Sequence, residues 1–134
     1  MAALTEQQAQ LLLDKNFASL ATIRADGTPH VTPVWVDWDG EAVVVNTALG
    51  RAKERYMRRD PRVAVEVFDH SNPYQYVSIT GTAELVEAGA DEHINKLAKK
   101  YLGLDEYPYR QPGEQRVIVR VRPERVTGLG VERT

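Results

Sequence analysis

The fold and the candidate site both depend on residues 45–53, which read Val45-Asn46-Thr47-Ala48-Leu49-Gly50-Arg51-Ala52-Lys53. An extended apolar run ends there in a glycine, and a helical pattern with cationic first residues begins. Helix N-termini carry unsatisfied N–H groups and partial positive charge, so Arg51 and Lys53 weaken the helix unless an anion binds there. A phosphate could accept hydrogen bonds from the N–H groups while Arg51 supplies a fork and Lys53 a point charge. The alternative is a solvated basic face, which would consist of Arg51, Lys53, Arg55, Arg58 and Arg59. Charge alone does not separate the two interpretations, and the glycine followed by a helix start favours phosphate.

Extended segments joined by tight turns precede this stretch. Asp26-Gly27 and Asp39-Gly40 each separate two apolar runs, and Asp-Gly in that setting is a strong hairpin signal. The predicted strands of this antiparallel meander cover residues 18–24, 30–38 and 41–47. A Thr-x-x-Gln capping box at Thr5 predicts an amphipathic helix over residues 5–16 in front of them.

The second half of the chain alternates between helical and extended patterns. Helical spacing from Ala52 stops at Asp60-Pro61, and residues 91–102 form a second amphipathic pattern with an acidic start and a basic end. Strands are predicted over residues 62–69, 76–86 and 116–122 and briefly around Val126, with a loop over residues 70–73. Because closure removes exposed strand edges, we expect a mainly β fold with short flanking helices (α+β). The expected architecture is an antiparallel split β-barrel of about six or seven strands, in one domain over residues 1–134.

Composition limits the classes of function. The chain has 134 residues, 43% of them hydrophobic, which fits one soluble domain. Lys and Arg number 17 against 19 Asp and Glu, and this balance argues against a nucleic-acid-binding protein. There is no Cys, and the three histidines lie far apart in the sequence, so we predict no metal site. No apolar run approaches the roughly 18 residues of a membrane span and no leader is visible, so a cytoplasmic protein is expected.

Pro33 interrupts a convincing strand, His30-Val31-Thr32-Pro33-Val34-Trp35. Proline cannot donate to a ladder, so this strand must lie at an edge, a bulge or a break. The freed backbone groups could pair with the edge of a flat heteroaromatic ring. The alternative is an edge-strand proline that prevents aggregation, which we would favour without the phosphate site. For Trp35 and Trp38, core filling is favoured over ring stacking.

Several of these segments together resemble the pyridoxamine 5'-phosphate oxidase-like split β-barrel proteins. They are Thr28-Pro29-His30-Val31-Thr32-Pro33-Val34-Trp35, Asn46-Thr47, Gly50-Arg51-Ala52-Lys53 and Arg58-Arg59-Asp60-Pro61-Arg62-Val63. Within that superfamily the chain is most similar to the small deazaflavin-dependent reductases (FDOR-B type), which bind coenzyme F420 as homodimers. The similarity runs from about residue 5 to residue 130. The helix start and the downstream Arg-Asp-Pro-Arg are fairly specific together.

The resemblance also implies a set of cofactor-binding residues. The phosphate would be bound by Arg51, Ala52 and Lys53, with Asn46, Thr47 and Ala48 lining the approach. The ring would be flanked by His30, Val31, Thr32, Pro33 and Val34. Tyr56 would face the same end of the helix, while Tyr74, Gln75 and Tyr76 would contribute across the dimer interface. Relatives can carry a side chain that hydrogen-bonds the ring at the position of Pro33, so here only main-chain contacts are expected.

The implied activity is transfer of a hydride from reduced F420 to an unsaturated small-molecule substrate. An alternative is an FMN-dependent enzyme that oxidises a pyridoxamine-type substrate, which needs a second anion site. The candidates for that site are Arg116, Arg120, Arg122 and Arg125, which are explained more simply as strand arginines facing water. A third hypothesis is a flavin- or deazaflavin-binding module without turnover. No catalytic residue is assigned, because the proton could come from solvent, Tyr74 or Tyr76.

Overall fold

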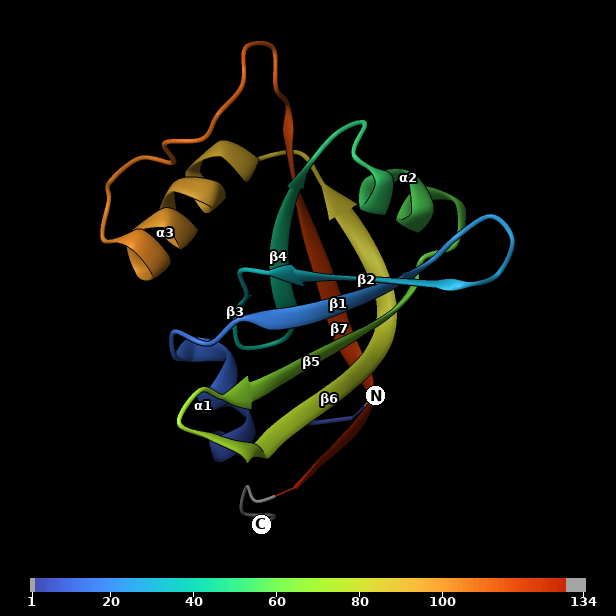
Figure 1. The fold of residues 1–134 in the computed structure, drawn as a ribbon, viewed down its shortest axis with the longest axis vertical. Coiled ribbons are helices and arrows are strands. Elements are labelled where there is room, and N and C mark those ends of the chain that lie inside the picture. The colour runs from blue at the N-terminus through green and yellow to red at the C-terminus, as the bar shows by residue number, and fades with distance from the viewer. Residues whose placement is uncertain (1, 130–134) are drawn as a thin grey trace.

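An antiparallel sheet of seven strands in the order β2-β1-β5-β6-β7-β4-β3 organises the chain, and the computed structural model describes residues 2–129 of it. The strands are β1 (Ala18–Ile23), β2 (Pro29–Val34), β3 (Asp37–Trp38), β4 (Val43–Ala48), β5 (Arg62–Asp69), β6 (Asn72–Val86) and β7 (Arg116–Leu129). The helices are α1 (Glu6–Leu13), α2 (Ala52–Arg59) and α3 (Ala90–Leu102). The sheet curls strongly into an open barrel (Figure 1), which confirms the predicted mainly β split-barrel fold.

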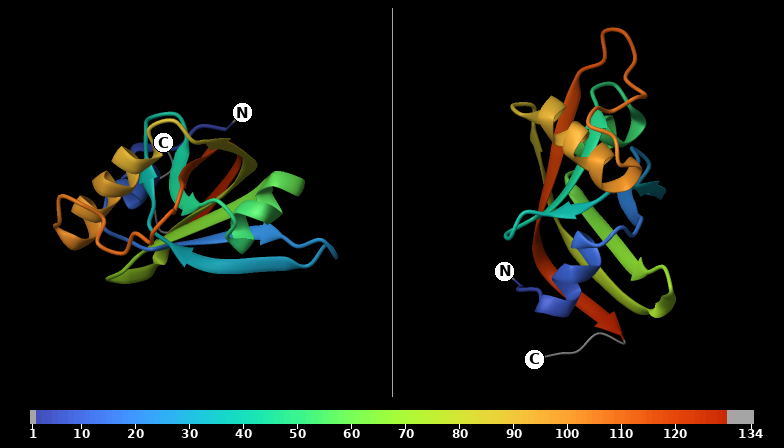
Figure 2. Two further views of the ribbon diagram at one scale, coloured as in Figure 1. Left: turned by 90° about the horizontal axis from the view of Figure 1, so that it is seen from above. Right: turned by 90° about the vertical axis from the view of Figure 1, so that its left-hand side faces the viewer.

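Alternating valines form the core inside the curl. On β5 the inward-facing Val63, Val65 and Val67 are at most 6% exposed, because side chains two residues apart share one face of a strand. Two short helices add apolar side chains to the same core, Leu12 from α1 and Met57 from α2. The third helix, α3, lies against β4 and β7 (Figure 2). It buries a separate small cluster of apolar side chains. This second cluster lies beside the candidate site.

The barrel is split between β2 and β3, which are the two ends of the sheet. The prediction of one continuous strand over residues 30–38 is therefore wrong, because the chain leaves the sheet at Trp35 and Val36, between β2 and β3. Side chains of α3 satisfy the backbone there: Val36 N–H donates to the Tyr101 hydroxyl at 3.0 Å, and Lys100 Nζ donates to Val36 O at 2.6 Å. Pro33 lies in β2, an edge strand, as the sequence predicted.

Three other boundaries in the first two-thirds of the chain differ from the sequence prediction by two residues or more. The first helix ends at Leu13, and the side-chain amide of Asn16 donates to Leu11 O at 3.0 Å instead of continuing it. The strand predicted from residue 41 starts at Val43, because a side-chain oxygen of Asp39 accepts the N–H groups of residues 41 and 42. The strand predicted from residue 76 starts at Asn72, so the expected loop over residues 70–73 is a tighter turn.

The C-terminal strand is continuous, although two strands were predicted. Pro123 is tolerated inside β7 because it lies opposite Gly81 of β6, next to a register shift in the ladder. Gly81 also allows the two backbones to approach, since a Cβ at this position would lie 2.4 Å from Arg122 O. This irregularity lets both long strands bend around the barrel.

Candidate functional site

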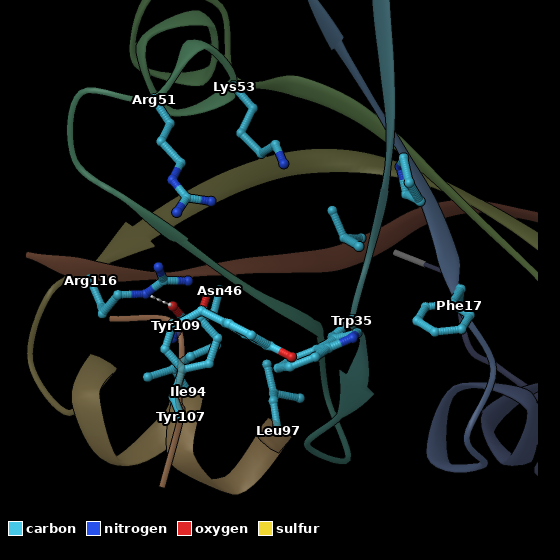
Figure 3. A pocket seen from close by; sticks show the side chains of 12 residues that line it. Phe17, Trp35, Asn46, Arg51, Lys53, Ile94, Leu97, Tyr107, Tyr109 and Arg116 are labelled. Atoms are coloured by element: carbon cyan, nitrogen blue, oxygen red, sulfur yellow. Dashed lines mark hydrogen bonds between the residues drawn. The ribbon is translucent and has the colours of Figure 1, made fainter. Parts of the chain in front are cut away.

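A pocket of about 290 Å³ lies at the split in the barrel, where β2 and β4 are not paired (Figure 3). Its walls come from three strands, β2, β4 and β7, from the first turn of α2, and from α3 with the segment that follows it. The lining residues are Phe17, Pro33, Val34, Trp35, Asn46, Arg51, Lys53, Ile94, Leu97, Tyr107, Tyr109 and Arg116. A wider groove of about 620 Å³ over β1, β5 and β6 contains none of the predicted cofactor-binding residues; of the candidates for a second anion site it contains Arg125. The split therefore brings together Pro33, Val34, Asn46, Arg51 and Lys53.

Two unpaired cations project into this pocket from the start of α2 (Figure 3). Arg51 is the N-cap residue and makes no side-chain capping bond, and Gly50 before it has a φ of 90°, which favours glycine. Within residues 2–129 neither Arg51 nor Lys53 has a side-chain hydrogen bond or an ion pair. Burial, Arg51 and Arg116 together lower the pKa of Lys53. Such an arrangement favours an anionic ligand.

The remaining cations of α2 are engaged elsewhere. Arg55 Nη1 donates to Gly50 O at 3.0 Å, Arg58 Nε pairs with Glu54 at 2.5 Å, and Arg59 Nη2 donates to Ile23 O at 3.1 Å. The basic residues of α2 and its N-cap therefore divide into those with a partner on the protein and those without one. Arg55, Arg58 and Arg59 have partners on the protein. Arg51, which is exposed, and Lys53, which is half-buried, have none within residues 2–129.

The start of α2 also contains a buried acid that the sequence analysis overlooked. Glu54 is 5% exposed and accepts hydrogen bonds from Gly50 N–H at 2.8 Å and from Arg58. Burial opposes its ionisation, but these hydrogen bonds and the nearby arginines hold the pKa of the carboxyl below its ordinary value. The Glu54 carboxylate therefore offsets part of the destabilisation that Arg51 and Lys53 cause at the start of α2. The sequence analysis assigned this compensation to a bound anion alone.

Arg116 lines this pocket, although the sequence analysis considered it only for a second anion site. The expectation that it faces water is wrong, since it is 5% exposed. Its Nε donates to Asn46 Oδ1 at 2.8 Å, its Nη1 pairs with Glu114, and its guanidinium lies 5.0 Å from the Tyr107 ring centroid. Strand alternation gave no sign of this burial, because α3 and the segment after it cover this end of the sheet.

Aromatic side chains form the opposite wall of the pocket. Trp35 stacks on Tyr101 with ring centroids 5.2 Å apart and meets Tyr107 edge-on at 6.0 Å. Tyr109 extends this wall and is 59% exposed. Trp38 packs against the core, as expected, whereas Trp35 lines the pocket as well as filling space.

The other predicted site residues do not line this pocket. They are His30, Val31, Thr32, Thr47, Ala48, Ala52, Tyr56, Tyr74, Gln75 and Tyr76. His30 contacts Tyr56 with ring centroids 5.3 Å apart, and the hydroxyls of Thr32 and Thr47 are buried without a hydrogen-bond partner within residues 2–129. Residues 74–76 lie at the start of β6, where Tyr74 is 74% exposed. Their contribution across a dimer interface stays a prediction.

Residues 2–129 contain neither a metal-binding cluster nor a membrane-spanning helix. No group of three or more acidic or histidine side chains could hold a metal ion. No helix in this part of the chain is long and apolar enough to cross a membrane.

Comparison with known proteins supports the resemblance seen in the sequence. A family model described as pyridoxamine 5'-phosphate oxidase matches residues 4–130. The F420H(2)-dependent biliverdin reductase of Mycobacterium tuberculosis (strain CDC 1551 / Oshkosh) is 23% identical over 128 residues, covering 93% of this chain and 88% of that protein.

Two solved structures extend the comparison. One described as an F420 reductase is 34% identical, with a TM-score of 0.80, covering 92% of this chain and 98% of that one. A conserved hypothetical protein of Mycobacterium tuberculosis is 28% identical, with a TM-score of 0.74, covering 95% of this chain and 85% of that one. The similarity therefore extends over nearly the whole length of these proteins.

Proposed function

We propose that this chain, which belongs to the pyridoxamine 5'-phosphate oxidase family, is an oxidoreductase that uses coenzyme F420 to reduce an unsaturated small molecule. The observation that carries the proposal is the pair of unpaired cations, Arg51 and Lys53, in a pocket that also contains buried Arg116 and an aromatic wall. The names of two relatives, an F420 reductase and an F420H(2)-dependent biliverdin reductase, favour the deazaflavin over other cofactors.

The residues present suit a phosphate-bearing planar cofactor. Arg51 and Lys53 would hold the phosphate, since their side chains have no protein partner within residues 2–129 and lie beside helix N–H groups. Pro33 and Val34 on β2 would contact the ring, and Trp35 offers an aromatic face nearby. The single-chain pocket of about 290 Å³ is small for a whole nucleotide-like cofactor. We therefore also propose a homodimer, in which a second copy completes the site through its residues 74–76.

When bound in reduced form, F420 would supply hydride-transfer chemistry while resisting one-electron reaction with oxygen. The protein would contribute binding, orientation and shielding from water. The cations fix the phosphate end, and the aromatic wall excludes water from the other end. No acid or base side chain is required for this role, and we assign no catalytic residue.

A flavin-dependent pyridoxamine phosphate oxidase is a weaker alternative, although FMN could bind the same cations. A second anion site is needed for the phosphorylated substrate, and its candidates are largely engaged. Arg120 pairs with Asp39 at 2.8 Å and with Glu84 at 3.4 Å, and Arg122 lies 3.8 Å from Glu41. These ion pairs favour a structural role for Arg120 and Arg122. Arg116 belongs to the cofactor pocket itself, and Arg125 has no ion pair within residues 2–129.

Titration of the purified protein with F420 and FMN side by side tests the proposal. We expect F420 fluorescence to be quenched at low concentrations of protein and FMN to bind far more weakly. Copurification of yellow flavin, or equal affinity for FMN, would instead favour the flavin enzyme. Binding without consumption of reduced F420 across enones, quinones and tetrapyrroles would favour a binding module. Size-exclusion chromatography with light scattering tests the dimer.

A further inference from the structure

The side-chain amide of Asn46 has a fixed orientation beneath the pocket. Its oxygen accepts a hydrogen bond from Arg116 Nε at 2.8 Å, and its nitrogen donates to Ala90 O at 3.0 Å. An arginine can only donate and a carbonyl can only accept, so these two partners leave one orientation. Turning the amide over would place two donors together at Arg116 and two acceptors together at Ala90.

This orientation determines the protonation of His93. The same Asn46 nitrogen lies 3.0 Å from His93 Nδ1, and an amide nitrogen has a second hydrogen to donate there. Nδ1 must therefore accept, and a neutral ring then carries its proton on Nε2. Nε2 is buried and has no hydrogen-bond partner within residues 2–129. A protonated ring would place an N–H against the amide NH₂, where two donors cannot bond.

We propose that His93 is a positioning residue, whose neutral ring holds the Asn46 amide and, through it, the Arg116 guanidinium at the wall of the anion pocket. Arg116 has two further restraints, the ion pair with Glu114 and the Tyr107 ring. Within residues 2–129 the bond to Asn46 is the one that engages Nε, and it adds a third restraint on the rotation of the guanidinium plane. This inference rests on the proposed function, because it concerns the anion site of the same cofactor pocket.

The surroundings of His93 keep the ring neutral near physiological pH. Burial lowers its pKa below the ordinary value of 6.5, Lys96 and Arg116 lower it further, and Asp37 and Asp39 oppose the shift. The network is therefore intact at neutral pH. It is lost as the pH falls through this lowered pKa, when protonation turns the Nδ1 acceptor into a donor. Loss of the oriented guanidinium then weakens anion binding, while the added charge on His93 acts in the opposite direction.

Two variants separate these effects. His93→Asn places an amide oxygen near the position of Nδ1, so it accepts the same bond but cannot be protonated. His93→Leu removes the acceptor at every pH. Circular dichroism and urea unfolding establish that both variants fold.

The first measurement uses ligand-free protein, so it does not depend on the proposed cofactor. A ¹H–¹⁵N spectrum of the histidine rings, assigned by the signals lost in His93→Asn, reports which nitrogen carries the proton. We expect Nε2 protonated and Nδ1 bare at about pH 8, with the Arg116 Nε–H signal protected from exchange in wild type and His93→Asn and exposed in His93→Leu. A proton on Nδ1 at that pH, or equal Arg116 protection in all three proteins, would overturn the inference.

The second measurement is affinity for F420 from about pH 8 to pH 5. Any titration of F420 itself is common to the three proteins and cancels from ratios of their affinities. We expect wild type and His93→Asn to bind equally at pH 8, His93→Leu to bind about tenfold more weakly, and wild type alone to approach the His93→Leu value in acid. Wild-type affinity that rises relative to His93→Asn in acid would mean that His93 acts by charge alone. If no protein binds F420 at any pH, the proposed function fails, and the ring spectrum still decides the role of His93.

Discussion

The phenol oxygen of Tyr101 lies 3.0 Å from the backbone nitrogen of Val36 and accepts its hydrogen, at the break between β2 and β3. The same hydroxyl donates to Asn16 O at 2.6 Å. Burial raises the pKa of Tyr101 to about 12, so the hydroxyl keeps its proton across the neutral range. One side chain of α3 thus holds two segments that leave the sheet at the edge of the pocket.

Tyr101→Phe should destabilise the protein because it leaves the buried N–H of Val36 without a partner. We expect the free energy of unfolding to fall by about 1–3 kcal/mol, measured by urea denaturation. Tyr74→Phe is the matched control, since Tyr74 is 74% exposed and should change stability little. Equal stability of both variants would show that water or another group replaces the Tyr101 hydroxyl.

Lys53→Met should weaken cofactor binding without destabilising the fold. Lys53 has no protein partner within residues 2–129 and is repelled by Arg51 and Arg116, so unfolding free energy should change by less than about 0.5 kcal/mol. Loss of one charge-assisted hydrogen bond to a phosphate corresponds to an affinity for F420 about 10- to 100-fold lower. Lys15→Met, at an exposed position outside the pocket, is the control. Unchanged affinity in Lys53→Met would remove Lys53 from the anion site.

Affinity for F420 should also decline in alkaline solution. Burial and the neighbouring arginines lower the pKa of Lys53 below its ordinary value of 10.5. The anion binds the charged ammonium, so affinity is full below this lowered pKa and falls as the pH rises through it. Lys53→Arg keeps its charge at these pH values and should give a flat profile. Fluorescence titration from about pH 7 to pH 10 measures both, and identical profiles would contradict the assignment.

Local signals in the sequence predicted most of the fold. The two Asp-Gly turns were correctly placed between paired strands, β1 with β2 and β3 with β4, and the alternating valines gave β5, because turn chemistry and period-two burial act over a few residues. The break at Trp35 and Val36 could not be predicted in this way, since it depends on Lys100 and Tyr101, which are distant in sequence.

The site was predicted where it depends on one helix start and missed where it depends on packing. Gly50, Arg51 and Lys53 are adjacent in the chain, so their pattern was visible. The burial of Arg116 arises from the segment after α3, and its contact with Asn46 joins β7 to β4. In the sequence, this buried pair looks the same as two polar residues that face water on different strands.

Glu54→Gln should destabilise α2 in a pH-dependent way. The carboxylate accepts from Gly50 N–H and pairs with Arg58, and glutamine retains an acceptor but loses the charge. We expect a loss of about 1–3 kcal/mol at neutral pH. Burial raises the pKa of Glu54 in the folded protein, but hydrogen bonds lower it further, to below the ordinary value of 4.5. The charge of Glu54 therefore stabilises the fold fully above pH 4.5, and this stabilisation is lost as the pH falls through the folded pKa. The difference between wild type and variant in urea unfolding should therefore shrink below about pH 4.5, whereas exposed Glu66→Gln should show little difference at any pH. A difference that stays constant into acid would mean that the side chain stabilises α2 by packing and not by its charge.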